Sequence, residues 1–307
     1  MKKAHIALPL LMPALLITAC GRVPSKQQIQ STENTQGVVY TSDSRKEISE
    51  VKTPAVLKIA RSAVAFIDYN NMERRGDEYV MSARTLKDEF NMCSNQRYAD
   101  QQSVANCSGI LISPKHVLTA GHCINEDTCY LYKMVFDFKH ESPFYASDRQ
   151  NYRIPSNNVY SCKKVVARVS QPGWTTHDYS IVELDRPVQG REPVSPSYKT
   201  LKPNDPVFTL GFPTGIAMKW AHGMVRVDLN ETTYKTAIDT FSGNSGSPVF
   251  DEKSGALIGI LTGGESDFVY NPQDACNDIK VCASGTCMGE RVFKLSAIAS
   301  VLKKYAR

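Results

Sequence analysis

The stretch CSGILISPKHVLTAGHC occupies residues Cys107–Cys123 and contains two apolar runs on either side of a polar turn. Short runs of Val, Ile and Leu that end at turn residues are typical of β-strands. We therefore predict a strand over Ser108–Ser113 and a second over Val117–Ala120, with a turn between them. The stretch ends in a histidine beside a cysteine, and such a pair taken alone is more often structural than catalytic.

Similar apolar runs recur along the chain between turn residues: Ala63–Ile67, Leu131–Phe138, Lys164–Val169, Tyr179–Leu184, Val207–Phe212, Met224–Leu229, Tyr234–Ile238, Ser247–Phe250 and Ala256–Leu261. Their number and spacing predict an all-β sandwich or barrel. Only two segments have the apolar spacing of a helix, Ser82–Met92 and a C-terminal stripe formed by Leu295, Ile298, Ala299 and Leu302. An α/β hydrolase, in which helices alternate with strands, is therefore disfavoured.

The composition is that of a globular protein. Of the 307 residues, 42% are hydrophobic and 22% are charged, which is enough for a sizeable core. Beyond the N-terminus no apolar run approaches the roughly 18 residues of a membrane-spanning helix. The net charge is +5, and without Lys2 and Lys3 the 36 Lys and Arg residues become 34 against 31 acids, or +3. This charge is too small for a nucleic-acid-binding protein.

The N-terminus has the pattern of an export signal. Lys2 and Lys3 precede an apolar stretch, Ile6–Ile17, and small residues follow it. The segment that ends at Cys20 resembles the bacterial lipoprotein box, in which the cysteine is acylated and becomes the mature N-terminus. Residues 1–19 are thus predicted to be removed and Cys20 to carry palmitate and other acyl chains that anchor the protein to the cell envelope. Gly21 favours the outer membrane by resemblance to sorted lipoproteins, and the alternative is an ordinary signal peptide with an incidental cysteine.

Residues 20–53 are rich in Ser, Thr, Gln and Asn and contain few large apolar residues. Such a segment buries too little apolar surface to offset its ordering entropy, so we predict a flexible tether. Its last part, from Val38 to Ile48, is alternatively an edge strand that docks on the following domain. That domain is predicted to span residues 54–307.

Eight cysteines follow Cys20: Cys93, Cys107, Cys123, Cys129, Cys162, Cys276, Cys282 and Cys287. An even number in an exported chain indicates disulfides. A zinc site is disfavoured because the cysteines do not form paired CxxC knuckles and no HExxH helix is present. We therefore expect no metal and no cofactor.

Three segments together resemble the chymotrypsin-like (trypsin-like) serine proteases. The first is LTAGHC, Leu118–Cys123, which is similar to the segment around the family's histidine. The second is THDYSIVEL, Thr176–Leu184, which is similar to the family's aspartate and the apolar run after it. The third is FSGNSGSPVF, Phe241–Phe250, which resembles the nucleophile loop. A His-Asp pair before a strand is usually a turn or cap, but the order His, Asp, Ser is that of the chymotrypsin group.

The resemblance implies a role for each matched residue. His122, Asp178 and Ser245 correspond to the catalytic triad, and the N–H groups of Gly243 and Ser245 correspond to the oxyanion hole. It also implies a disulfide between the cysteines that flank the histidine segment, Cys107 and Cys123. Asn244 and Ser247 are similar to the bacterial glutamyl endopeptidase branch of the family.

The fold implied by the resemblance is a pair of antiparallel six-stranded β-barrels of chymotrypsin type, with a boundary near residue 190 and a C-terminal helix. The predicted function is that of an exported serine endopeptidase which hydrolyses protein or peptide substrates through an acyl-enzyme intermediate. One alternative is a noncatalytic, protease-like surface protein that binds partners. Another is a lipase-like acyl hydrolase, which the missing Gly-x-Ser-x-Gly elbow disfavours.

Specificity and activation depart from the family pattern. Asp239 lies six residues before Ser245, where trypsin carries the acid that binds Lys or Arg. Leu261 occupies the position of a glutamate-recognising histidine in glutamyl-specific relatives, which disfavours cleavage after Glu. These two residues are the predicted pocket residues, and cleavage after a basic residue is the working hypothesis. Because the segment from Val38 resembles a mature glutamyl endopeptidase N-terminus, processing there would release the enzyme from its lipid.

Two segments have no counterpart in the family pattern. An insertion covers about Asn70–Ser103, and a cysteine-rich stretch covers Cys276–Cys287. Both are predicted to shape substrate access. The six cysteines outside the implied Cys107–Cys123 pair allow fifteen pairings, and the sequence favours none.

Overall fold

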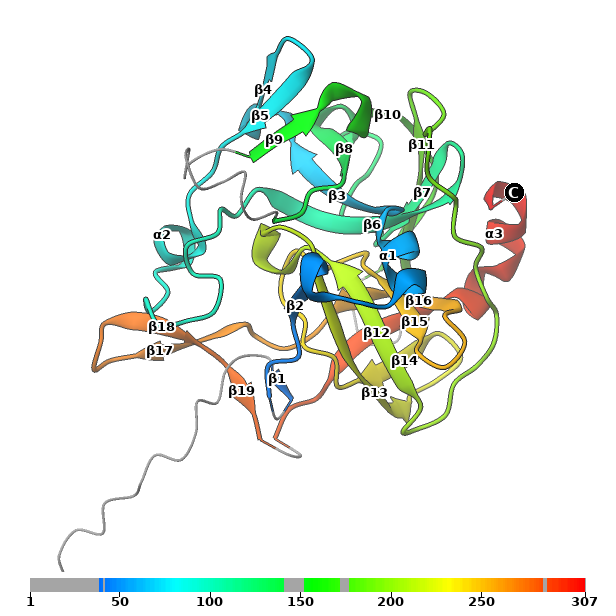
Figure 1. Ribbon diagram of the computed structural model, residues 1–307. Helices are drawn as coiled ribbons and strands as arrows, with labels where there is room; N and C mark the ends of the chain where they lie inside the picture. Colours follow the sequence, from blue (N-terminus) through cyan, green and yellow to red (C-terminus); the bar gives the residue numbers. More distant parts are fainter. Residues whose placement is uncertain (1–38, 41, 141–151, 172–176, 284–285, 307) are drawn as a thin grey trace, which may run out of the picture. The chain divides into compact units, whose positions relative to one another are not determined.

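The computed structural model describes residues 39–40, 42–140, 152–171, 177–283 and 286–306 (Figure 1). The predicted signal segment, Cys20 and residues 20–38 of the predicted tether lie outside this part of the chain. Within the described residues no helix is long and apolar enough to cross a membrane.

The first barrel contains six strands: β3 (Ala63–Asp68), β6 (Ala105–Ser113), β7 (His116–Thr119), β8 (Tyr132–Phe136), β10 (Val159–Ser170) and β11 (Asp178–Leu184). They close in the order β10-β11-β7-β6-β3-β8, and every pairing is antiparallel. Alternate residues of β3 point to opposite faces, as in any strand. Val64 and Phe66 fill the barrel interior, whereas Ala65 and Ile67 join a second apolar cluster that also contains residues of the other half of the chain. The continuous apolar runs of the sequence are therefore strands buried on both faces.

The second barrel also contains six strands: β12 (Pro206–Gly211), β13 (Lys219–Asp228), β14 (Thr233–Thr236), β15 (Pro248–Asp251), β16 (Leu257–Gly263) and β20 (Glu290–Lys294). They follow the order β12-β15-β16-β20-β14-β13, and a β12–β13 pairing closes the ring. Each of the eleven strands predicted from sequence overlaps one barrel strand, and β20 is the barrel strand that was not predicted. The prediction of two six-stranded antiparallel barrels is confirmed.

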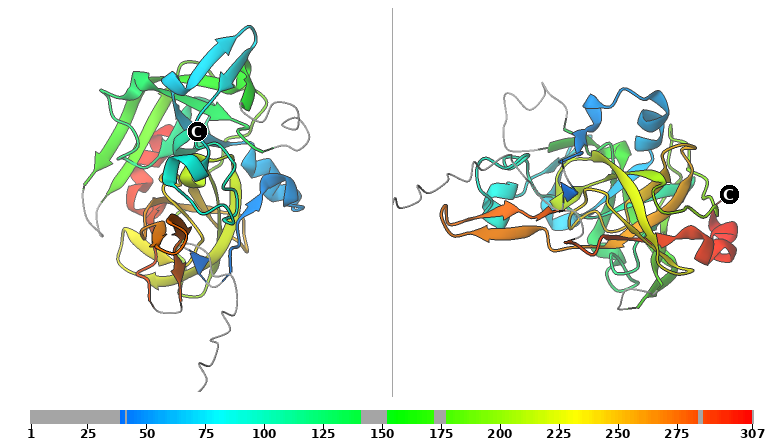
Figure 2. Two further views of the ribbon diagram at one scale, coloured as in Figure 1. Left: turned by 90° about the vertical axis from the view of Figure 1, so that its left-hand side faces the viewer. Right: turned by 90° about the horizontal axis from the view of Figure 1, so that it is seen from below.

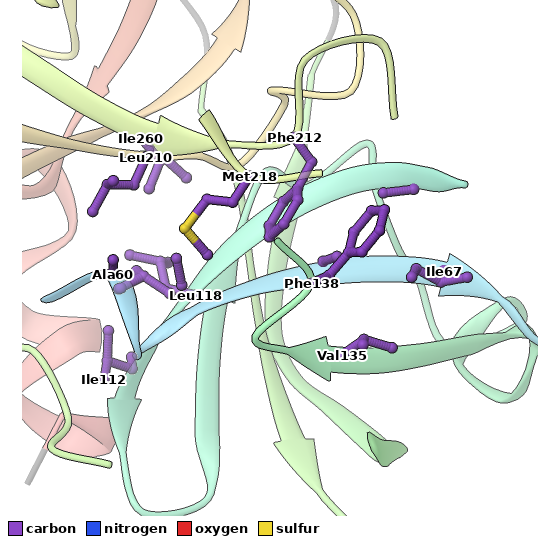
Figure 3. Close-up of a cluster of buried hydrophobic side chains, with 14 of the residues drawn as sticks. Ala60, Ile67, Ile112, Leu118, Val135, Phe138, Leu210, Phe212, Met218 and Ile260 are labelled. Carbon is purple, nitrogen blue, oxygen red and sulfur yellow. The ribbon is translucent and has the colours of Figure 1, made fainter. Parts of the chain in front are cut away.

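An apolar core joins the two barrels (Figure 3). Ile112 and Leu118 of the first barrel and Leu210 and Ile260 of the second belong to this cluster. Phe138, which follows β8, stacks on Phe212, which follows β12, with ring centroids 5.7 Å apart. Such a pair contributes about 0.5–1.5 kcal/mol beyond the burial of its area. The packing fixes the two barrels against each other.

The C-terminal helix is confirmed, as a 3-10 turn, η6 (Leu295–Ile298), followed by α3 (Ala299–Tyr305). The Tyr305 hydroxyl donates to the carbonyl of Val166 in the first barrel at 3.1 Å. Helix α2 (Leu86–Phe90) is shorter than the predicted segment, and α1 (Pro54–Ala60) was not predicted. Helix α1 begins at a proline after Thr53, which is a helix start signal. It has only seven residues, and so short a helix shows no clear apolar periodicity in the sequence.

The segment before α1 packs against the second barrel (Figures 1 and 2). Strand β1 (Val39–Tyr40) pairs in parallel with β19 (Val281–Cys282), and β2 (Lys46–Glu47) pairs with β13. A 3-10 turn, η1 (Ile48–Glu50), leads to α1. Strands β1 and β2 of the predicted tether are therefore paired with later parts of the chain, and β2 extends the sheet of the second barrel.

The insertion and the cysteine-rich stretch form small sheets outside the barrels. The insertion contributes β4 (Met72–Arg75) and β5 (Glu78–Met81), and β5 also pairs with β9 (Tyr152–Pro155). The cysteine-rich stretch contributes β18 (Cys276–Ile279), which forms a hairpin with the preceding strand β17 (Phe268–Asn271). The remaining turns are η2 (Tyr69–Asn71), η3 (Cys129–Leu131), η4 (Ser156–Asn158) and η5 (Pro213–Gly215). The described residues form four disulfides: Cys93–Cys276, Cys107–Cys123, Cys129–Cys162 and Cys282–Cys287. The first joins the insertion to the cysteine-rich stretch, 183 residues apart in sequence.

Candidate active site

His122 and Asp178 meet because two strands of the first barrel pair in register. Strands β7 and β11 are antiparallel, with Thr119 opposite Ser180. His122 lies three residues beyond Thr119, and Asp178 lies two residues before Ser180, so both project from the same end of this strand pair. The sheet thus joins two segments that are more than fifty residues apart in sequence.

Asp178 binds the histidine at two points. Its Oδ1 accepts the backbone N–H of His122 at 2.9 Å, and its Oδ2 lies 2.7 Å from His122 Nδ1. The carboxylate is 14% exposed and the imidazole 42% exposed, so the acid is shielded while the histidine reaches solvent. This contact orients the ring and leaves Nε2 free to face a reacting group.

The turn before the histidine requires glycine. A Cβ at Gly121 would lie 2.0 Å from the carbonyl oxygen of Val169 and 2.9 Å from Asp178 Oδ1. No side chain fits at that distance, because the clash is with backbone. Glycine at position 121 therefore allows this turn to pack directly against the backbone of β10.

Ser245 lies in the loop between β14 and β15. Gly243 and Gly246 have φ values of +85° and +83°, a region that glycine enters without strain. Ser108 on β6 holds this loop to the first barrel, since its N–H donates to the Ser245 carbonyl at 2.8 Å and its hydroxyl donates to the Gly243 carbonyl at 2.7 Å. The neighbouring Cys107 is bonded to Cys123, which follows His122. One strand and one disulfide thus connect the serine loop to the histidine turn.

The two predicted oxyanion-hole N–H groups are available. Among the described residues, neither the Gly243 nor the Ser245 N–H donates to a backbone carbonyl, whereas the Asn244, Gly246 and Ser247 N–H groups all do. Two free backbone donors in one tight turn can stabilise a negatively charged oxygen.

A pocket of about 90 Å³ opens beside Ser245. Leu261, one of the two predicted pocket residues, lines it, together with three carboxylic acids, Glu265, Asp267 and Glu290. The Leu261 carbonyl accepts the Gly246 N–H at 2.7 Å, which fixes the pocket wall to the serine loop. The volume exceeds that of a single water and suits the end of a side chain.

Asp239, the other predicted pocket residue, contacts the N-terminal segment. Its carboxylate accepts the N–H of Tyr40 at 2.8 Å and the N–H of Ser44 at 2.7 Å. The side chain lines a separate cavity, of about 480 Å³, and does not line the pocket beside Ser245. Burial raises the pKa of Asp239 to about 6.

One compact group of metal-binding residue types lies in the described part of the chain. Cys107, His122 and Cys123 place their ligand atoms within 4.8 Å of one another. However, the two sulfurs form a disulfide, and disulfide sulfur lacks the thiolate charge that metals require. The residues of this group therefore do not fit a metal site in this oxidation state.

Sequence reasoning missed Ser108 and the two acids Asp267 and Glu290. Ser108 follows Cys107 in the decisive stretch but carries no motif of its own, because its importance comes from contacts more than 130 residues away. Glu290 is 3% exposed, although charged residues at the end of a cysteine-rich loop are normally solvated. No local pattern identifies either role.

Comparison with known proteins agrees with this geometry. A family model described as a trypsin-like peptidase domain matches residues 107–260, which include His122, Asp178 and Ser245. The chain is 30% identical over 159 residues to the glutamyl endopeptidase of Bacillus licheniformis, covering 50% of this chain and 47% of that protein. It is 27% identical over 205 residues to a protein of Bacillus subtilis named extracellular metalloprotease, covering 61% of each.

The chain spans about half the length of the first relative and about three fifths of the second. Among solved structures, the VesB protease of Vibrio cholerae matches with a TM-score of 0.50 and 13% identity, over 86% of this chain and 67% of that chain. At this identity the match shows a similar fold only. Half of the sequence matches the family model, across both barrels. The chain therefore belongs to the family of trypsin-like peptidase domains.

Proposed function

We propose that this peptidase is a serine endopeptidase whose nucleophile is Ser245. His122 Nε2 takes the hydroxyl proton as Ser245 Oγ attacks the scissile carbonyl carbon. The proton then passes to the leaving amine, and an acyl-enzyme remains on Ser245. Water, deprotonated by the same histidine, attacks the ester, and the released proton returns to Ser245 as the carboxylic acid product leaves.

Asp178 supports this role of the histidine. Its contact with Nδ1 at 2.7 Å fixes the tautomer in which Nε2 is the free base. The same carboxylate stabilises the imidazolium that forms during each acyl-transfer step. This two-point contact between Asp178 and His122 is the observation that carries the proposal.

The N–H groups of Gly243 and Ser245 would hold the negatively charged oxygen of the tetrahedral intermediate. One such donor contributes on the order of 3–4 kcal/mol to the transition state. The second relative is named a metalloprotease, but we propose serine chemistry here because the compact Cys107, His122 and Cys123 group is closed by a disulfide.

We also propose that the enzyme works outside the cytoplasm, anchored through lipid at Cys20. Four disulfides in the described residues are typical of an oxidising compartment. Processing near Val38 remains part of this proposal, and it would separate the peptidase from the anchor. Mass spectrometry of the mature protein from the cell envelope would detect either an acylated Cys20 or a new N-terminus at Val38.

The test of the catalytic proposal is peptide hydrolysis by purified protein that lacks residues 1–20. The wild type is expected to cleave casein and members of a peptide library, and Ser245→Ala is expected to lose several powers of ten in kcat. A folded wild type that binds peptides without cleaving them would support the noncatalytic binding protein instead. Release of fatty acids from lipid esters in place of peptide cleavage would support the acyl hydrolase.

A further inference from the structure

The pocket beside Ser245 has an unusual concentration of acids. Glu265, Asp267 and Glu290 line it, and no Lys, Arg or His is among its lining residues. A substrate side chain with a negative charge would therefore meet like charges there. The remaining lining residues are all uncharged: Thr240, Phe241, Ser242, Asn244, Ser245, Leu261, Gly263 and Gly264.

The three acids differ in how far their charge is compensated. Glu265 forms an ion pair with Lys280 at 2.8 Å and accepts the N–H of Met288. Asp267 and Glu290 form no ion pair with any described residue. Asp267 accepts the Ser242 N–H at 3.0 Å, and Glu290 accepts the hydroxyls of Thr240 at 2.8 Å and Tyr40 at 3.1 Å.

Burial is costly for two carboxyl groups without a cation. It raises the pKa of Glu290 to about 8 and the pKa of Asp267 above its usual range. Both side chains are less than a tenth exposed, so solvent compensates their charge poorly. A cationic group that enters the pocket would restore the charged form of Glu290 and gain a strong interaction.

The nearest cations of the protein are already engaged. Lys280 is bound to Glu265. The buried Arg45 is bound to Asp43 at 2.9 Å, and its charge only partly offsets the effect of burial on the pKa of Asp267. Arg291, next to Glu290 in sequence, lies against Gly263 and donates to the Thr262 carbonyl at 3.4 Å. Among the described residues, Asp267 and Glu290 are thus left without an ion-pair partner, and an external cation would supply one.

We propose that the pocket beside Ser245 selects Lys or Arg on the amino side of the scissile bond, with Glu290 as the main specificity-determining acid and Asp267 as the second. This inference rests on the proposed function. It assigns specificity to residues that are distant in sequence from Asp239, because Asp239 lines a separate cavity and does not line this pocket.

The first test uses fluorogenic peptides that differ only at the residue before the cleaved bond: Arg, its uncharged isostere citrulline, Lys, Glu and Gln. The wild type is expected to prefer Arg over citrulline by at least about 30-fold in kcat/KM, the usual effect of a buried charge pair. Preference for Glu, or equal cleavage of Arg and citrulline peptides, would overturn the inference.

Variants then locate the specificity. Glu290→Gln should lower the Arg-to-citrulline ratio by about 30-fold, and Asp267→Asn should lower it by a smaller factor. Asp239→Asn is the matched control, and it should leave the ratio within about twofold because the side chain lies outside the pocket. The ratio is insensitive to partial loss of folded enzyme. If Asp239→Asn abolished the preference for Arg and Glu290→Gln kept the wild-type ratio, the assignment would be overturned.

The pH dependence of the same ratio provides a second readout, in which pH effects common to both substrates cancel. In the free pocket Glu290 faces Tyr40, Thr240, Glu265 with its partner Lys280, and Asp267. Because protonated Glu290 attracts a cation weakly, the wild-type ratio should rise about tenfold from pH 7 to pH 9. It should stay flat in Glu290→Gln, and a flat wild-type profile would contradict the role of Glu290.

The two proposals fail in different ways. If no peptide is cleaved and a fluorophosphonate probe does not label Ser245 in folded protein, the serine endopeptidase itself is refuted, and the specificity with it. If Ser245 is labelled and peptides are cleaved without preference for a basic residue, only the specificity is refuted.

Discussion

Ser108→Ala tests whether the contact between the barrels positions the serine loop. The substitution removes one hydroxyl group and nothing else. That hydroxyl donates to the Gly243 carbonyl at 2.7 Å and accepts the N–H of Phe212 at 3.1 Å. The backbone bond from Ser108 to the Ser245 carbonyl is kept.

The expected loss of stability follows from two polar groups without partners. Ser108 and Phe212 are both fully buried, so water cannot replace the lost bonds easily. Each orphaned buried group costs about 1–3 kcal/mol, which gives a total of about 2–4 kcal/mol once the partly exposed Gly243 is allowed for. Because Gly243 supplies a proposed oxyanion donor, kcat should also fall, by about 10-fold to 100-fold. KM should change little, since the pocket walls are not altered.

The assay combines urea denaturation with steady-state kinetics on one peptide substrate. Ser62→Ala is the matched control: Ser62 is buried, and its hydroxyl donates to the Glu192 carbonyl at 2.6 Å, but it does not contact the serine loop. It should lose stability and keep kcat. Equal kcat in wild type and Ser108→Ala, with stability reduced, would show that Ser108 is only structural and would refute the reasoning.

Three further predictions concern the histidine turn and the N-terminal segment. Asp178→Asn should lower kcat by about 10⁴-fold, because the amide favours the wrong tautomer of His122; a loss below tenfold in steady-state kinetics would contradict this. Gly121→Ala should prevent folding, since its methyl group would lie 2.0 Å from the Val169 carbonyl oxygen, and a circular dichroism melt equal to that of the wild type would be the contrary result. Burial raises the pKa of Asp239 from 3.8 to about 6, so the Asp239 carboxyl stays protonated to a higher pH in the folded protein than in the unfolded chain. The stability of the wild type relative to Asp239→Asn should therefore fall by about 2–3 kcal/mol from pH 4 to pH 6.5. Denaturation curves with the same difference at both pH values would rule out this role for Asp239.

The barrels were predictable because their strands are buried on both faces or alternate cleanly in hydrophobicity. Strand β20 was missed for a specific reason. Its sequence, Glu290-Arg-Val-Phe-Lys294, has charged residues at three of five positions, yet Glu290 and Lys294 are both buried. Glu290 lines the pocket, and Lys294 is neutralised by Asp228. Strand prediction from hydrophobicity places charged residues at the surface, so it fails where a pocket or an ion pair holds a charged side chain in the interior.

The site residues divide in the same way. His122, Asp178 and Ser245 lie in motifs whose local sequence is informative, and the register of β7 and β11 brings the first two together. Asp239 occupies a position that the family resemblance associates with the pocket, but its carboxylate accepts the N–H of Tyr40, 199 residues away. Contacts of that range depend on the packing of the whole chain, so neither this contact nor the Cys93–Cys276 pair was readable from the sequence.

The central claim is that Ser245 is a nucleophile activated by His122. The most direct measurement is fluorophosphonate labelling of the folded protein, followed by mass spectrometric mapping of the modified residue. The account predicts one adduct, on Ser245, that is absent from Ser245→Ala and strongly reduced in His122→Ala. An adduct on another serine, or a folded protein that remains unlabelled after trimming to Val38, would contradict it.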